Sequence, residues 1–345
     1  MFGTDGGAAF AKAPGESDIR LRPDRLGKHF EGRLGRFAFD ELSERYIERQ
    51  GLGFMRGVPI PLRDEDVGAF AAGEGLSVLR LGANMAQVMG ASPGFAHTGA
   101  YVGFLKAHFR EKAAAGLVRR AKEDAARGDH DSACIHFRAA LCVEPDGLDA
   151  MYGYALACRD MYGRGGSSEY VGSFKAESLE YFELTTLAHP RFPAAYYYLG
   201  YAYLNLGLYQ KAALAWKGYL DCSTHPEDRG EIKGRLRQLA EPIEIERGCN
   251  AVLARRWDEG IGALEPYLGS RYGGWWPLYY YLGAAYANTG RSDEAADMFR
   301  KALRLNPSHA ESMDELAFIY DADGDRELSM KYRRKAELVR RGGHR

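Results

Sequence analysis

The chain has 345 residues, 46% hydrophobic and 27% charged, with a formal net charge of −1. This is the composition of an ordinary globular protein, and a net charge near zero excludes a general attraction to nucleic acid or membrane surfaces. No stretch approaches the roughly 18 uninterrupted apolar residues of a spanning helix, and the first residues lack the apolar core of a secretory signal. The five cysteines form no CxxC pair, which favours free thiols in a reducing compartment, so we expect a cytoplasmic protein.

Residues 1–35 are rich in Gly, Arg and Asp and show little periodicity, which predicts a flexible leader. Residues 36–112 predict a small helical domain. Within it, Phe39, Leu42 and Tyr46 recur at helical spacing, and Gly51 is a typical carboxy-terminal cap. Further helices are expected near residues 63–72, 76–89 and 95–110, with an extended connector at residues 57–61.

The run at residues 86–92 (AQVMGAS) resembles the turn of a DNA-binding helix-turn-helix. Its reading helix would begin at Pro93, and a reading helix needs Arg, Lys, Asn or Gln near its start to reach base edges. The first eight residues of this helix (PGFAHTGA) contain none of these side chains. A helix hairpin that caps the following array is therefore favoured, and a DNA-binding regulator is kept as the alternative.

Residues 113–345 contain repeated helix pairs. The clearest unit spans residues 276–309, where large and small apolar residues recur along a first helix at Tyr279, Leu282, Gly283 and Tyr286, and along a second helix at Ala295, Phe299 and Ala302 before Pro307. This pattern resembles the tetratricopeptide repeat. The resemblance implies an all-α protein, a right-handed solenoid of helix hairpins, whose function lies in a continuous binding surface.

The same offsets recur, with departures, in units at residues 114–147, 148–192, 193–226 and 241–274 and in one that starts at residue 310, about six units in all. Polar residues replace expected apolar ones at Arg120, Asp124, Glu244, Arg247 and Arg333. Two breaks in the register predict insertions, an extra loop near residues 162–174 and an extra helix near residues 227–240.

The first helix of each pair lines the concave side in this family, so the stripe of that helix that does not enter the core is the candidate binding surface. Residues four apart share one helix face. The expected exposed stripe consists of Tyr152, Tyr197, Tyr201, Asn205, Tyr280, Asn288 and Phe318. Tyrosine offers contact area at low entropic cost and asparagine can bond a peptide backbone, so we expect an extended peptide or helix as the partner. The alternative is that these tyrosines only pack against neighbouring helices.

An enzyme is the competing class, and the glycine-rich stretch 163–168 is its best support. A phosphate-binding P-loop requires a lysine beside the final hydroxyl and a preceding strand, and neither is present. No nucleophile elbow or zinc-protease spacing occurs, and Cys134, His130 and His136 do not have the spacing of a zinc site. We therefore predict an adaptor without catalytic residues, metal or cofactor. The basic run at residues 331–345 is interpreted as the solvated face of a capping helix.

Overall fold

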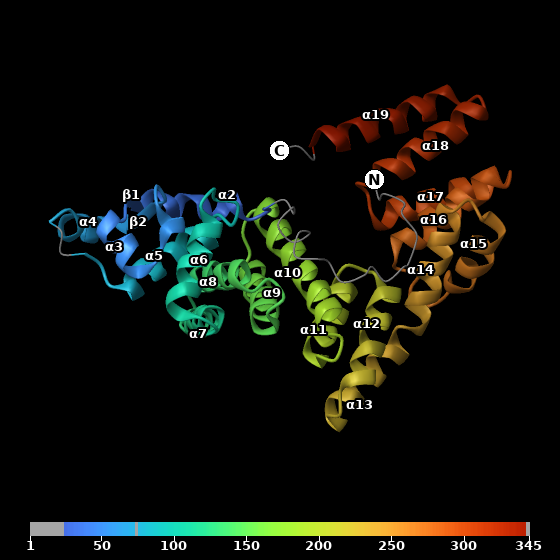
Figure 1. Ribbon diagram of the computed structural model, residues 1–345. Coiled ribbons are helices and arrows are strands. Elements are labelled where there is room, and N and C mark those ends of the chain that lie inside the picture. Colours follow the sequence, from blue (N-terminus) through green and yellow to red (C-terminus); the bar gives the residue numbers. More distant parts are fainter. Residues whose placement is uncertain (1–23, 73–74, 343–345) are drawn as a thin grey trace. The chain divides into compact units, whose positions relative to one another are not determined.

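The computed structural model describes residues 24–72 and 75–342 (Figure 1). The chain divides into two compact units, residues 1–202 and residues 203–345. The fold class is an all-α solenoid of helical hairpins, as the repeats predict. Across the described residues, no helix has both the length and the apolar character needed to cross a membrane. The part of the expected leader at residues 1–23 lies outside the described residues.

The expectation of a flexible leader is wrong for residues 24–35. Residues 24–36 are named here the N-terminal strap. They form α2 (Gly27–Phe30) and a 3-10 helix η1 (Glu31–Arg36). Leu26 and Phe30 are 1% and 0% exposed and belong to a core shared with α8, α9 and α10. The strap is ordered because these two apolar side chains bury themselves against helices more than a hundred residues further along the chain.

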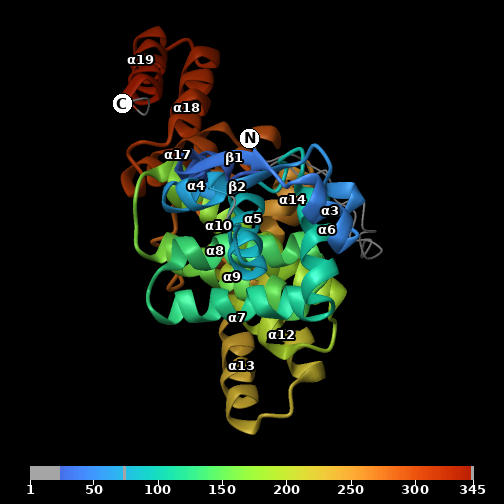
Figure 2. The same cartoon turned by 60° about the vertical axis from the view of Figure 1, so that its left-hand side comes forward.

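A helix over Phe39 is also a wrong prediction. Residues Phe37–Glu41 form strand β1, which pairs antiparallel with β2 (Pro59–Arg63), and the connector expected at residues 57–61 contributes to β2. The helix α3 (Glu44–Gln50) begins only after Ser43, whose side chain accepts a hydrogen bond from the Tyr46 amide. It ends at Gly51, which adopts φ 66° as expected of a cap. A short 3-10 helix η2 (Gly53–Met55) and α4 (Asp64–Ala71) complete this region, and Figure 2 shows both strands beside α4.

Helices α5 (Val78–Ala91) and α6 (Thr98–Phe109) carry the run that resembles a helix-turn-helix. The glycine of that run has a packing role. A Cβ placed on Gly90 would lie 2.7 Å from the carbonyl carbon of Ile135 and nearer still to its oxygen, so only glycine allows α5 to approach α8 this closely. Buried side chains including Met85, Tyr101 and Phe104 form the core of this region.

The repeat region of the first unit consists of α7 (Lys112–Ala126), α8 (His130–Val143), α9 (Leu148–Gly163) and α10 (Ser168–Ala188), followed by α11 (Pro193–Asn205). The division between the units falls within α11. The insertion near residues 162–174 is mostly helical, because it lengthens α9 and α10. Only residues 164–167 lie outside a helix, and they are exposed.

The second unit continues with α12 (Tyr209–Cys222), α13 (Pro226–Gln238), α14 (Ala240–Leu253), α15 (Trp257–Leu264), the 3-10 helix η3 (Glu265–Tyr267), α16 (Trp276–Asn288), α17 (Ser292–Leu305), α18 (Ala310–Ala322) and α19 (Arg326–Gly342). Helix α13 occupies the register break near residues 227–240. In the α16–α17 hairpin, a Cβ on Gly283 would lie 2.9 Å from the Phe299 ring, which explains the small residue opposite the aromatic one.

Candidate functional site

In the first unit, the predicted stripe residue Tyr152 lies in a cluster of aromatic rings. Its ring centroid is 4.9 Å from that of Phe192 and 6.2 Å from those of Phe182 and Tyr198. Burial in this cluster raises the pKa of Tyr152 to about 12, so its hydroxyl stays protonated and can donate a hydrogen bond at neutral pH. Tyr152 is half-buried, so one part of the ring packs and the other is accessible.

Helix α11 adds Tyr197, Tyr198 and Tyr201 to the same cluster. The Tyr197 ring is 5.1 Å from that of Tyr201 and 5.4 Å from that of Tyr198. Tyr198 stacks on Phe182, and the guanidinium of Arg159 lies 4.7 Å from the Tyr198 centroid. The sequence prediction omitted Tyr198, although the run of three tyrosines was a visible signal that more than one helix face is aromatic.

In the second unit, Tyr280 on α16 is half-buried against its neighbours. Its ring lies 4.7 Å from His309 and 6.0 Å from Phe299, and Trp276 contacts the same histidine at 4.3 Å. Burial, and after it the nearby carboxylate of Glu315, raises the pKa of Tyr280 to about 12. Sequence reasoning missed His309, which stands in the turn between two helices and gives no periodic signal.

The expected exposed stripe is exposed only in part. Asn205, Asn288 and Phe318 are exposed, Phe318 to 71%, whereas the four tyrosines of the stripe are half-buried. The cause is the packing of their rings on adjacent helices. The carboxamide of Asn288 donates to the Ala284 carbonyl oxygen at 2.8 Å, so it is held within its own helix.

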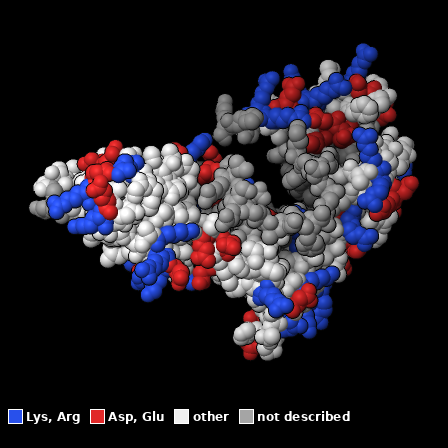
Figure 3. Space-filling model, in the orientation of Figure 1, with Lys and Arg blue, Asp and Glu red and all other residues white. Residues whose placement is uncertain are grey.

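Helix α18 carries carboxylates at Glu311, Asp314 and Glu315, all on the same helix as Phe318. Glu311 lies 3.3 Å from His309, and Asp314 pairs with Arg340 of α19. Among the described residues, no cation lies within ion-pair distance of Glu315, and burial raises the pKa of this carboxyl group. Figure 3 shows Asp and Glu side chains over α18 and Lys and Arg side chains over α19. This face combines an exposed aromatic ring with negative charge.

A buried polar cluster occurs in the repeat at residues 114–147, where the sequence departs from the repeat pattern. Asp124, at a position where the repeat has an aromatic residue, is buried and lies 2.5 Å from Nδ1 of His136. The Nε2 of that histidine is 2.9 Å from the Gln87 amide nitrogen, so both ring nitrogens are satisfied by a neutral imidazole. Desolvation lowers the pKa of His136. This network fills the interior with bonded polar groups, and the described residues contain no group of three or more His, Cys, Asp or Glu arranged to hold a metal ion.

Two family models for the tetratricopeptide repeat match the chain, one at residues 276–309 and one at residues 166–223. A curated protein of Pseudomonas aeruginosa named "Probable biofilm formation methyltransferase WspC" is 33% identical over 99 residues. The match covers 28% of this chain and 23% of that protein, so the chain spans less than a quarter of this relative.

Similar solved structures include the tetratricopeptide repeat domain of P58(IPK), at 20% identity, with 66% of this chain and 60% of that chain covered and a TM-score of 0.39. MamA from Desulfovibrio magneticus RS-1 is 21% identical, with 55% and 96% covered and a TM-score of 0.32. Scores this low support no inference about function. The matched repeat models, together with the helix hairpins at the same positions, identify residues 166–223 and 276–309 as tetratricopeptide repeats.

Proposed function

We propose that this protein is an adaptor without catalytic activity, which binds an extended peptide or a helix of a partner protein on the first-helix faces of its repeats. Tetratricopeptide repeats form protein-interaction scaffolds, which agrees with this class of function. The observation that carries the proposal is the half-exposed aromatic cluster of α9 and α11, formed by Tyr152, Tyr197, Tyr198 and Tyr201. Aromatic rings that are fixed by packing yet accessible are favoured anchors in protein interfaces.

The face of α16 and α18 supports the same proposal within the second unit. Phe318 is a large apolar side chain that is mostly exposed, and exposed aromatic residues of this size are typical of interaction sites. Its neighbour Glu315 is a carboxylate available to a donor on the partner. The limited match to a methyltransferase-named protein covers too little of that protein to transfer its activity to this chain.

The test compares cross-linking mass spectrometry in native lysate for the wild type and for the double variant Tyr201→Ala/Tyr280→Ala. We expect cross-links from partner proteins to map to α9, α11, α16 or α18 in the wild type and to disappear in the variant. A few aromatic anchors carry most of the binding energy in a typical interface, so two truncations suffice.

The matched control is Leu214→Ala/Leu253→Ala, in which two leucines that are 56% and 60% exposed are truncated on other helices. This control should keep every partner. The proposal is wrong if the tyrosine variant retains all partners at unchanged yield. It also fails if circular dichroism shows that this variant unfolds as readily as Phe299→Ala, because the tyrosines would then be core residues.

A further inference from the structure

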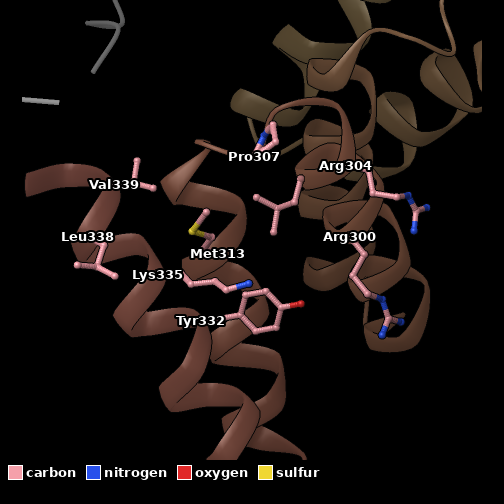
Figure 4. A pocket seen from close by; sticks show the side chains of 9 residues that line it. Arg300, Arg304, Pro307, Met313, Tyr332, Lys335, Leu338 and Val339 are labelled. Carbon is pink, nitrogen blue, oxygen red and sulfur yellow. The ribbon is translucent and has the colours of Figure 1, made fainter. Parts of the chain in front are cut away.

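The second unit contains an open groove between α17 and α19, which are the second helices of its last two repeats. It is named here the α17–α19 groove. It has a volume of about 540 Å³ and is lined by Arg300, Leu303, Arg304 and Pro307 from α17 and the following turn, by Met313 from α18, and by Tyr332, Lys335, Leu338 and Val339 from α19. Figure 4 shows the side chains of α17 and α19 on opposite sides, with Met313 between them. This size is within the range of ligand-binding clefts.

The floor of the groove is apolar and its rim is cationic. Leu338 is 61% exposed and adds accessible apolar surface to the groove. Arg300 pairs with Asp297 on its own helix and donates to the Tyr320 hydroxyl. Among the described residues, no carboxylate lies within ion-pair distance of Arg304 or Lys335. The groove therefore offers uncompensated positive charge around an apolar surface.

The first unit has the same kind of groove, between α8 and α10, and there it is filled by the chain itself. The N-terminal strap inserts Leu26 and Phe30 into the core that α8, α9 and α10 share. Asp24 pairs with the buried Arg138, and the Arg138 guanidinium lies 5.2 Å from the Phe30 ring centroid. The occupant is thus a short helix with two apolar side chains four residues apart and an acidic residue just before them.

The repeat register shows that the two grooves are built from equivalent positions. Aligning Phe137 with Phe299, the aromatic residues of the two second helices, places Arg138 on Arg300 and Leu141 on Leu303. The same register places Met151 on Met313. The arginine that binds Asp24 of the strap therefore has a counterpart at the rim of the α17–α19 groove.

One pair of equivalent positions differs in charge. In the first unit, Arg25 of the strap pairs with Glu177 and Glu180 of α10. Aligning Ser178 with Ser329 places Leu328 and Lys331 of α19 at those two positions. A segment that fits the α17–α19 groove must therefore be acidic where the strap carries Arg25. This difference excludes the strap of a second copy as the best occupant.

We infer that the α17–α19 groove binds an acidic helical segment of a partner protein. This segment has two consecutive acidic residues followed directly by a large apolar residue, and a second large apolar residue lies four positions after the first apolar one. This binding surface is formed by second helices, so it is additional to the first-helix faces of the proposed function. The acidic residues would meet Arg300 and Lys331, and the apolar pair would cover Leu303, Met313 and Leu338.

The test uses fluorescent peptides of residues 24–31 and full-length protein. The peptide with Arg25→Glu should bind about fivefold or more tightly than the native peptide, because one repulsion by Lys331 becomes an attraction. Adding Phe30→Ala to that peptide should weaken binding about thirtyfold, the effect of losing an apolar anchor. In the protein variant Lys331→Glu the preference should reverse in favour of the native peptide. The matched control is Arg334→Glu, which changes an exposed arginine of the same helix that is equivalent to neither Glu177 nor Glu180. It should change neither preference.

Two outcomes would overturn the inference. The first is that the Arg25→Glu peptide does not bind, or that it binds the protein variant Arg304→Glu/Lys335→Glu as tightly as the wild type. Unchanged binding would mean that the peptide occupies another site, such as the α8–α10 groove. The second is sedimentation that shows self-association abolished by this rim variant, which would assign the groove to a second copy. The protein variants Lys331→Glu and Arg304→Glu/Lys335→Glu replace exposed side chains, so circular dichroism should show an unchanged helix content.

Discussion

The close approach of α5 to α8 makes a sharp prediction for Gly90→Ala. The added methyl group would lie 2.7 Å from the Ile135 carbonyl carbon and also from its Cγ2, whereas ordinary contacts begin near 3.4 Å. The obstacle includes backbone atoms, which cannot rotate away, so α5 must shift. Overpacking of this kind costs about 3 kcal/mol at the upper end of its usual range, and alanine regains about 1 kcal/mol through helix propensity. We expect a net loss of about 2 kcal/mol in the free energy of unfolding.

The matched control is Gly116→Ala in the interior of α7, where an added Cβ has no atom within 4 Å. The same substitution should there stabilise the protein by about 0.5–1 kcal/mol, because only the propensity term remains. Urea denaturation of the full chain measures both, and hydrogen exchange should show faster exchange in α5 and α8 for Gly90→Ala alone. Equal or greater stability of Gly90→Ala would refute the packing argument.

Burial lowers the pKa of His136, so below the ordinary value of 6.5 the unfolded chain binds protons more readily than the folded chain, and the free energy of unfolding decreases as the pH is lowered. The variant His136→Gln should reduce this pH dependence in urea titrations between about pH 7 and pH 5. An unchanged pH dependence would assign the effect to other histidines. Phe299→Ala removes a ring that is 0% exposed and should cost about 3–5 kcal/mol, whereas a cost below about 1 kcal/mol would mean that the hairpin core is loose. Limited proteolysis should cut first at the exposed residues 164–167, and protection by ATP or GTP would indicate a phosphate site. Truncation before Ala310 removes α18 and α19, and with α18 it removes Leu316 and Ile319 from the core. This truncation should lower the melting temperature or cause aggregation, and an unaltered melting temperature would contradict this packing.

The repeated hairpins could be predicted from sequence because their signal is local. Gly283 and Phe299 are only sixteen positions apart, and each lies on a helix whose apolar residues recur with the helical period. The candidate stripe was predicted for the same reason, since residues four apart share a helix face. Its exposure could not be predicted in the same way, because the half-burial of Tyr152 and Tyr280 depends on rings from neighbouring helices.

Tertiary structure decided the features that join distant parts of the chain. Phe39 continues a helical spacing into Tyr46, yet it lies on a strand because β1 pairs with β2 about twenty residues later. Leu26 and Phe30 stand alone in a polar stretch, and only the groove between α8 and α10 orders them. The α17–α19 groove has no sequence signature of its own. It becomes visible only when equivalent repeat positions are compared in space, because one groove is filled by the chain and the other is open.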